Sequence, residues 1–177
     1  MIVALFLGSF NPLHCGHVAI GRYIIDNCKV DQMQYILSPI NPLKEGQYLE
    51  DPQTRLKRLR EEIALEFNDS RVVVSDIEFH LAKPLYTINT LRHLRDNNPE
   101  NAYILIIGAD NLAIIDKWYK WHEILSEFEV WVYPRAPHDA KILAAKYNAM
   151  NPQYRIRAID APLHNISSTQ IREKNNL

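Results

Sequence analysis

The strongest constraint on the fold is a regular alternation of short apolar runs with segments of helical spacing. Extended, mostly apolar runs occupy residues 2–7, 33–37, 71–79, 102–108, 128–133 and 154–159. Apolar residues recur every three or four positions, as in amphipathic helices, within residues 17–27, 53–67, 87–97 and 138–150. Apolar strands that alternate with helices are typical of a parallel sheet covered on both faces. The sequence therefore predicts an α/β fold with a doubly wound, Rossmann-like parallel sheet.

Length and composition exclude several classes of protein. The 177 residues suffice for a single domain over 1–177 with its own core. The formal net charge of −1 supplies no basic field, so nucleic acid is not an expected partner. No apolar run reaches the length of a membrane span, and residues 1–8 lack the basic start of a signal peptide. Cys15 and Cys28 form neither a disulfide framework nor a metal-binding spacing, which favours the reducing cytoplasm.

The turn after the first expected strand, GSFNPLHCGH at residues 8–17, lies where such folds bind ligands. Gly8 lets the backbone approach a ligand closely, and Gly16 leaves the N–H groups at the helix start accessible to anions. His14 and His17 can each donate an N–H group to phosphate oxygens without carrying the permanent charge of lysine. This combination predicts a site for phosphate chemistry.

Two other interpretations of this turn are weaker. His14 and His17 could bind a metal ion, but only Cys15 is near as a third ligand, so we expect no metal held by the protein. Cys15, beside a helix start, could be an activated nucleophile. Because no base is identifiable as its partner, we expect Cys15 to be a small space-filling residue.

A second signal is NISSTQIRE at residues 165–173. Ser167 and Gln170 form the pattern of a capping box, with Ile166 and Ile171 as a hydrophobic staple, so a helix is expected to begin near residue 168. Capping leaves three polar residues unexplained, and together they suit an anion such as polyphosphate: Ser168, Thr169 and Arg172.

These two segments resemble the signatures of the nucleotidylyltransferases with an H-x-G-H motif. More narrowly, the chain is similar to the nicotinate- and nicotinamide-mononucleotide adenylyltransferase family. Three further segments, KPLYTINTL at 83–91, IIGADNL at 106–112 and DKWYKWHEI at 116–124, resemble family segments in family order. The resemblance extends from about residue 2 to residue 172.

The resemblance implies a reaction and its reactants. The phosphate of nicotinate mononucleotide attacks the α-phosphorus of ATP, which gives nicotinate adenine dinucleotide and pyrophosphate, as in NAD biosynthesis. No covalent enzyme intermediate is expected, so the protein positions the reactants and stabilises charge. Mg²⁺ is expected to arrive with ATP, held by phosphates and water rather than by protein ligands.

The resemblance also implies roles for individual residues. The catalytic set is His14, His17 and Arg172. The ATP-binding set is Gly8, Ser9, Phe10, Gly16, His17, Gly108, Asp110, Ile166, Ser167, Ser168 and Arg172. The mononucleotide-binding set is Ser9, Lys44, Thr87, Ile88, Trp118, Tyr119 and Arg135.

Some of these residues have structural alternatives. Asp110 follows an expected strand end and could be a helix N-cap, as Thr87 could be for the helix at 87–97. Trp118 could belong to the core, although Trp121 is the better core candidate. The long connection at 38–52, which contains Lys44, is either a plain surface loop or a binding loop that closes as a lid. Lys44 favours a functional loop.

Several functions remain open from the sequence. Asn11 makes the turn similar to enzymes that accept nicotinamide mononucleotide as well, so an amide-specific or dual-specificity adenylyltransferase is an alternative. Transfer to another acceptor, and a nucleotide sensor without turnover, are less favoured because the segments at 83–91 and 116–124 suit the pyridine group and because His17 and Arg172 are both present. The sequence leaves the oligomeric state open, a homo-oligomer included.

Overall fold

A computed structural model describes residues 1–40 and 50–162 of the protein. Its centre is a parallel sheet of six strands in the order β3-β2-β1-β4-β5-β6. The strands are β1 (Ile2–Gly8), β2 (Gln32–Leu37), β3 (Val72–Ser75), β4 (Ala102–Gly108), β5 (Glu129–Tyr133) and β6 (Arg155–Ala158). The predicted doubly wound parallel sheet is confirmed.

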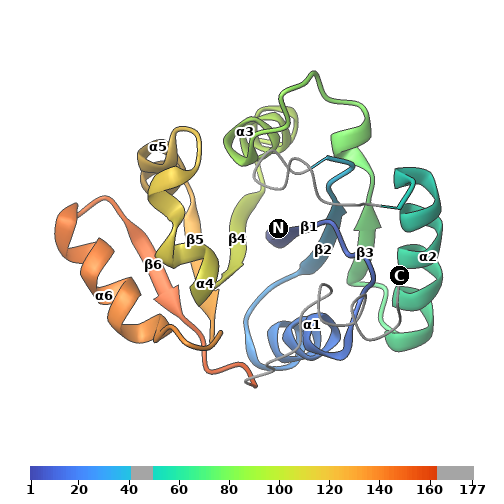
Figure 1. Cartoon of the computed structure of the whole chain (residues 1–177), viewed down its shortest axis with the longest axis horizontal. Coiled ribbons are helices and arrows are strands. Elements are labelled where there is room, and N and C mark those ends of the chain that lie inside the picture. Colours follow the sequence, from blue (N-terminus) through green and yellow to red (C-terminus); the bar gives the residue numbers. More distant parts are fainter. Residues whose placement is uncertain (41–49, 163–177) are drawn as a thin grey trace.

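Helices cover both faces of this sheet (Figure 1). They are α1 (Cys15–Asn27), α2 (Pro52–Glu66), α3 (Thr87–Asn97), α4 (Ala109–Ala113), α5 (Trp121–Glu127) and α6 (Ala140–Met150), with short 3₁₀ turns η2 (Ile77–Phe79) and η3 (Ile115–Lys117). Side chains of α1 and α2 belong to one buried cluster, and those of α3, α4, α5 and α6 belong to the other.

The strands divide their side chains between the two clusters by alternation. In β1, Val3 and Leu5 join the cluster under α3, whereas Ala4 and Phe6 join the cluster under α1. This division follows from the two-residue period of a strand. It explains why the central strands read as continuous apolar runs, because neither of their faces meets water.

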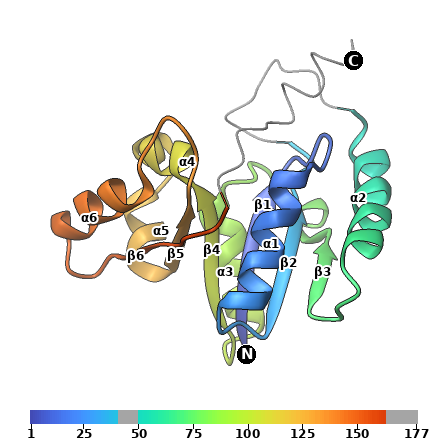
Figure 2. The ribbon, with the colours of Figure 1, turned by 90° about the horizontal axis from the view of Figure 1, so that it is seen from below.

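The site-forming end of the sheet lies where the chain order reverses. β1 is hydrogen-bonded to β2 on one side and to β4 on the other, so this boundary is the topological switch point of the fold. The parallel strands end toward the top of Figure 2, where the turn from β1 into α1 also lies. Any ligand bound at the switch point therefore meets residues 8–17 and the start of α3.

Three element predictions need correction. The expected extended run at 71–79 is wrong beyond Ser75, because η2 follows the four-residue strand β3. The helix expected at 17–27 begins two residues earlier, and the one expected at 138–150 begins at Ala140. Helices α4 and α5 were not predicted, because their five and seven residues are too few to display a helical period.

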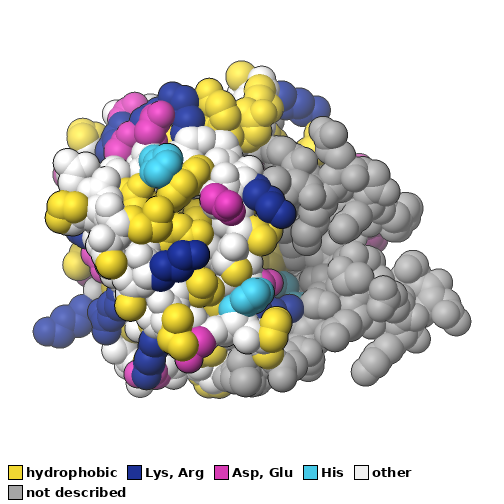
Figure 3. Space-filling view, turned by 60° about the vertical axis from the view of Figure 1, so that its left-hand side comes forward, with side chains coloured by type: hydrophobic (Ala, Val, Ile, Leu, Met, Phe, Trp, Pro, Cys, Tyr) yellow, Lys and Arg dark blue, Asp and Glu magenta, His cyan; other side chains and the backbone are white. Residues whose placement is uncertain are grey.

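The surface shows no concentration of one charge on the side turned forward in Figure 3, where Lys, Arg, Asp and Glu side chains are interspersed with apolar ones. Within residues 1–40 and 50–162, no helix has the length and apolar composition that crossing a bilayer requires.

Candidate active site

The two histidines of the first turn cap the helix that follows them. The N–H of His17 donates to Nδ1 of His14 at 3.4 Å, and the N–H of His14 donates to Nδ1 of His17 at 3.3 Å. The rings stack with their centroids 3.6 Å apart. This is a capping box built from imidazoles, since His14 is the N-cap and His17 the third helical residue.

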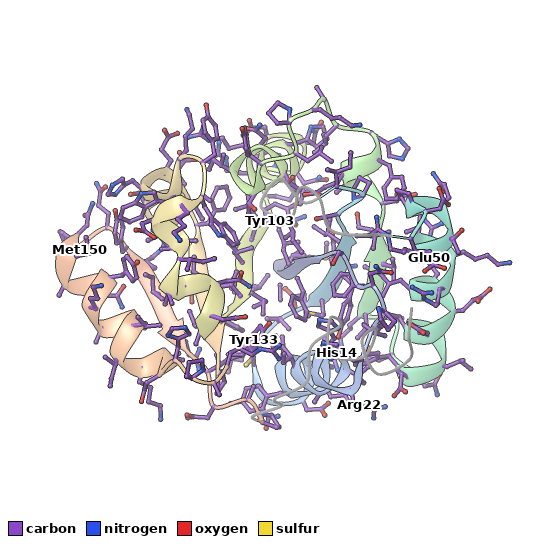
Figure 4. The ribbon with its side chains drawn as sticks, viewed as in Figure 1. His14, Arg22, Glu50, Tyr103, Tyr133 and Met150 are labelled. Atoms are coloured by element: carbon purple, nitrogen blue, oxygen red, sulfur yellow. The ribbon has the colours of Figure 1, made fainter. Side chains whose placement is uncertain are left out.

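The reciprocal cap also fixes the chemistry of both rings. Because each Nδ1 accepts a hydrogen bond, a neutral ring carries its proton on Nε2. Each histidine can therefore donate from Nε2, beside a helix start that favours anions. Figure 4 labels His14, which lies beside α1. The spacing of three residues is thus explained by both the cap and the pair of donors.

His17 is held in place by aromatic neighbours and by β2. Its ring centroid lies 5.6 Å from that of Phe6 and 5.1 Å from that of Phe10. The hydroxyl of buried Tyr35 donates to the His17 carbonyl at 2.9 Å, and burial raises the pKa of that hydroxyl. A Cβ on Gly21 would lie 2.0 Å from the same hydroxyl oxygen, so α1 needs a glycine there to approach Tyr35.

Cys15 does not have the role expected of it. It is the first residue of α1 and is exposed, so the expectation of a small space-filling residue is wrong. The helix start turns its side chain outward while His14 takes the cap position. Neither Cys15 nor Cys28 is in a disulfide.

A cavity of about 370 Å³ opens at the switch point. Its walls come from the ends of β1 and β2, the start of α3, strand β4 and the connection from α4 to α5. Four residues of the predicted site line it, namely Gly8, Thr87, Trp118 and Tyr119. The structure therefore brings together two separate segments predicted for the mononucleotide, at residues 87 and 118–119, and places Gly8 of the predicted ATP-binding set beside them.

The first turn of α3 at this cavity has no side-chain cap. Tyr86 is the N-cap residue, so the alternative role of Thr87 as N-cap is wrong. No side chain caps the turn and no acidic residue lies in it. In the part of the chain that the structure describes, the N–H groups of Thr87 and Ile88 donate to no protein atom. Ile88 is fully buried, so only its backbone can serve a ligand. These N–H groups suit an anion.

Aromatic side chains form a wall of the cavity. Tyr119 stacks on Tyr86 with ring centroids 4.3 Å apart. The indole Nε1 of Trp118 is buried and donates to no described residue. Trp121 does not line the cavity but contacts the rings of His122 and Tyr147. Like Trp118, it is partly buried against the core. A flat apolar ring bordered by an anionic group would match this wall and the start of α3.

Comparison with known proteins identifies the family. Residues 5–174 match the model of a family described as cytidylyltransferase-like. A protein of Cytophaga hutchinsonii named probable nicotinate-nucleotide adenylyltransferase is 38% identical over 97% of this chain and 84% of its own length. A Bacteroides fragilis protein with the same name is 37% identical over 96% of this chain and 79% of its own.

The chain belongs to the nicotinate-nucleotide adenylyltransferase family. A Plasmodium falciparum nicotinic acid mononucleotide adenylyltransferase, solved in complex with NaAD, superposes with a TM-score of 0.78. That likeness covers 97% of this chain and 82% of the other at 17% identity, and it shows the shared fold. The predicted family is therefore confirmed.

Asp110, which follows the end of β4, lies beside Arg135. Asp110 Oδ2 lies 3.8 Å from Arg135 Nε. A Cβ on Gly108 would lie 2.3 Å from Asp110 Oδ1, so the glycine makes room for this carboxylate. Gly108 is the N-cap of α4, which makes the N-cap alternative for Asp110 wrong. Arg135, expected at the mononucleotide, is not among the residues that line the cavity.

Two buried charged residues near the site were missed by the sequence analysis. Glu78 of η2 lines the cavity and is only 2% exposed. Thr90 Oγ1 donates to Glu78 Oε1 at 2.7 Å, and burial raises the pKa of this carboxyl. The sequence could have indicated Glu78, because an acidic residue between Ile77 and Phe79 is unusual in an apolar stretch. The sequence does not indicate the burial of the other residue, Arg55, because an arginine among the many charged residues of a helix is expected to be exposed to solvent.

The remaining predicted residues divide into two groups. Ser9 and Phe10 are buried in the turn after β1, and Gly16 is buried in the first turn of α1. The others lie outside the described residues, so their predicted roles stay predictions: Lys44, Ile166, Ser167, Ser168 and Arg172.

Proposed function

We propose that this protein transfers the adenylyl group of ATP to nicotinate mononucleotide. A phosphate oxygen of the mononucleotide bonds to the α-phosphorus of ATP, while the bond from that phosphorus to the oxygen that bridges it to the β-phosphorus breaks. The products are nicotinate adenine dinucleotide and pyrophosphate. The names of the relatives support this reaction.

One observation carries the proposal. The uncapped first turn of α3 and the aromatic wall share a cavity with Gly8, at the end of the strand that leads into the His14–His17 pair. The cavity offers a ring-binding wall and anion-binding N–H groups, and the histidine pair offers donors for phosphate oxygens. A pyridine mononucleotide has these features in this order, a ring with an acidic substituent and a phosphate.

The histidines act on the reacting phosphate. Charge grows on the phosphate oxygens as pyrophosphate leaves, and placed donors lower the barrier to this step. The reciprocal cap holds both rings before substrate arrives, so their orientation costs no reorganisation during the reaction. By family resemblance, Ser167, Ser168 and Arg172 bind the polyphosphate, and Lys44 with Ser9 binds the mononucleotide phosphate.

Asp110 suits the ribose of ATP. Its carboxylate lies at the carboxyl end of β4, where hydroxyl groups of a bound nucleotide can donate to it. Arg135 Nε lies 3.8 Å from Asp110 Oδ2 and orients this carboxylate. Arg135 therefore acts through Asp110 in this proposal rather than on the pyridine.

The acceptor is proposed to be the nicotinate form rather than the nicotinamide form. The N–H groups of Thr87 and Ile88 can only donate, so a carboxylate satisfies both whereas a carboxamide offers a single acceptor oxygen. A charge-assisted hydrogen bond contributes about 1.5–3 kcal/mol, against about 0.5–1.5 kcal/mol for a neutral one. This difference corresponds to a preference of about tenfold or more.

Mg²⁺ is proposed to enter as the ATP complex. Within residues 1–40 and 50–162, no group of three or more His, Cys, Asp or Glu side chains could hold a metal ion. In this proposal the substrate phosphates and water supply the ligands of the ion.

A pyrophosphate-release assay tests the proposal. ATP and magnesium would be supplied with nicotinate mononucleotide, nicotinamide mononucleotide or phosphopantetheine as acceptor. We expect turnover with nicotinate mononucleotide, with an efficiency at least about tenfold above that of the amide. Equal efficiencies, or a preference for the amide, would contradict the role of the first turn of α3. The proposed function would be overturned if phosphopantetheine were the one acceptor of the three that supports turnover, or if none of the three supported it.

A further inference from the structure

Arg55 is a fully buried charge whose hydrogen bonds, among the described residues, go only to backbone atoms. It lies in the first turn of α2 with 0% of its surface exposed. Its guanidinium donates to four carbonyl oxygens, those of Ser9 at 2.8 Å, Ser38 at 3.1 Å, Pro39 at 2.8 Å and Glu50 at 2.9 Å. These carbonyls belong to the turns that follow β1 and β2 and to Glu50, two residues before the start of α2. Arg55 therefore connects both turns at the edge of the cavity.

Backbone carbonyls, and no ion pair within residues 1–40 and 50–162, hold this guanidinium. In the part of the chain that the structure describes, no carboxylate pairs with it, and Glu50 pairs with Arg58 instead at 2.6 Å. Burial lowers the pKa of Arg55, but a guanidinium remains protonated in proteins. A buried and unpaired charge is costly, and carbonyl dipoles offset only part of that cost. Such a charge would be stabilised further by a nearby anion.

Two of the four peptide groups bonded to Arg55 have an N–H that can donate to a ligand, and the guanidinium polarises both of these groups. The Ser9 carbonyl shares its peptide with the N–H of Phe10, and the Pro39 carbonyl shares its peptide with the N–H of Ile40. In a trans peptide the N–H points away from the carbonyl, so both N–H groups point away from Arg55. Neither donates to a described residue. A hydrogen bond to a carbonyl strengthens the N–H of the same peptide as a donor.

One of these N–H groups belongs to a residue that lines the cavity, and the other follows such a residue closely in the sequence. Ile40 lines the cavity, and Phe10 is two residues after Gly8, which lines it as well. Phe10 has a φ of 39°, an unusual backbone conformation for a residue with a side chain, and the bond from Arg55 to Ser9 helps to hold it. The ring of Phe10 in turn contacts His17.

We propose that Arg55 is a positioning residue for substrate phosphate, which fixes the Ser9–Phe10 and Pro39–Ile40 peptides and transmits its charge through them to a bound phosphate monoester. The identity of that phosphate, the one on nicotinate mononucleotide, rests on the proposed function. Arg55 touches no substrate in this arrangement.

The first test compares a ligand that has the phosphate with one that lacks it. Affinities of Arg55→Met and Arg55→Lys for nicotinate mononucleotide and for nicotinate riboside would be measured by calorimetry. We expect Arg55→Met to weaken the mononucleotide by about tenfold to a hundredfold, the scale of a charge-assisted bond, and to leave the riboside within about twofold. Arg55→Lys, which keeps the charge but has fewer donors, should be intermediate.

Arg58→Met is the matched control. It removes one positive charge from the same helix but bonds to none of these carbonyls, so both affinities should stay at the wild-type values. Equal losses for the mononucleotide and the riboside in the Arg55 variants would overturn the proposal, because purely structural support would affect both. An Arg58→Met variant as weak as Arg55→Met would overturn it as well.

A second measurement needs no variant, in case Arg55→Met does not fold. Inorganic phosphate would be titrated into the wild-type protein labelled with ¹⁵N, and the amide signals of Phe10 and Ile40 would be followed. We expect both signals to move downfield along one binding curve. Unmoved signals at saturating phosphate would overturn the proposal. If they move while the wild-type protein makes no dinucleotide, the proposed function fails and the role of Arg55 stands.

Discussion

His17 combines a catalytic role with a structural one, and its replacement tests the first. His17→Ala removes one Nε2 donor from the transferred phosphate. We expect turnover to fall by about a hundredfold to a thousandfold, the scale for losing one oxyanion donor. His93→Ala, which changes an exposed histidine of α3, should leave turnover unchanged. Steady-state kinetics, with circular dichroism to verify folding, would measure both. Near-normal turnover in a folded His17→Ala protein would contradict the role.

Trp118 and Trp121 allow a matched comparison of binding with packing. Trp118 lines the cavity, whereas Trp121 packs against His122 and Tyr147. Trp118→Leu should raise the KM for the mononucleotide by about twofold to tenfold, the range of an aromatic pair, and leave the KM for ATP unchanged. Trp121→Leu should lower the Tm without changing either KM. The assignment fails if the two variants show the same pattern.

At the scale of elements, η2 and α3 are joined by a buried hydrogen bond that depends on pH. Burial raises the pKa of Glu78, so the folded protein binds its proton more tightly than the unfolded chain does. Ionising the buried carboxyl lowers the free energy of unfolding, and this loss is absent below the pKa of glutamate in the unfolded chain, about 4.3. It develops as the pH rises through the folded pKa and persists at neutral pH.

Glu78→Gln should therefore stabilise the protein at neutral pH relative to the wild type, and the difference should shrink toward pH 4. A glutamine oxygen can still accept from Thr90 Oγ1. Urea unfolding at several pH values would measure this, with exposed Glu61→Gln as the control that shows no such trend. A stability difference that does not change with pH would contradict the shift.

The elements also show what the sequence could predict and where it could not. Long periodic helices such as α2 and α3 were predicted to within about two residues. The short helices α4 and α5 were missed because five to seven residues carry too little periodic signal. The reciprocal cap of His14 and His17 was also missed, although both were predicted as donors. It depends on ring positions that spacing alone does not fix.

Arg55 shows a more general limit at the same scale. Its sequence neighbours include Lys57 and Arg58, so α2 reads as a helix with an ordinary charged face. What buries Arg55 is the convergence of three turns that are distant in sequence, at residues 9, 38–39 and 50. Only the assembled topology supplies those acceptors.

At the scale of the whole molecule, the binding of substrate should raise stability measurably. The N–H groups of Thr87 and Ile88 lack acceptors among the described residues, and an anionic ligand supplies them only in the folded state. A ligand at a hundred times its Kd stabilises a protein by about 2.7 kcal/mol. For a chain of this size that corresponds to a rise in Tm of about 5–10 °C.

Differential scanning fluorimetry with nicotinate mononucleotide and nicotinate riboside would measure this effect. The mononucleotide should raise the Tm further at equal concentration, since it adds a phosphate to the same ring. A riboside with an equal or larger effect would mean that the phosphate does not contribute favourably to binding.

The imidazole cap of α1 limits how this protein could be engineered. Serine or aspartate is the usual choice when a designer strengthens a helix start, and at most helices such an exchange leaves activity untouched. Here the capping side chains are the proposed phosphate donors themselves. Thermostabilising substitutions should therefore be sought at other helix ends, such as the C-terminal end of α3 at Asn98. A stronger cap at residues 14 and 17 would stabilise α1 but remove the phosphate donors and so lower turnover.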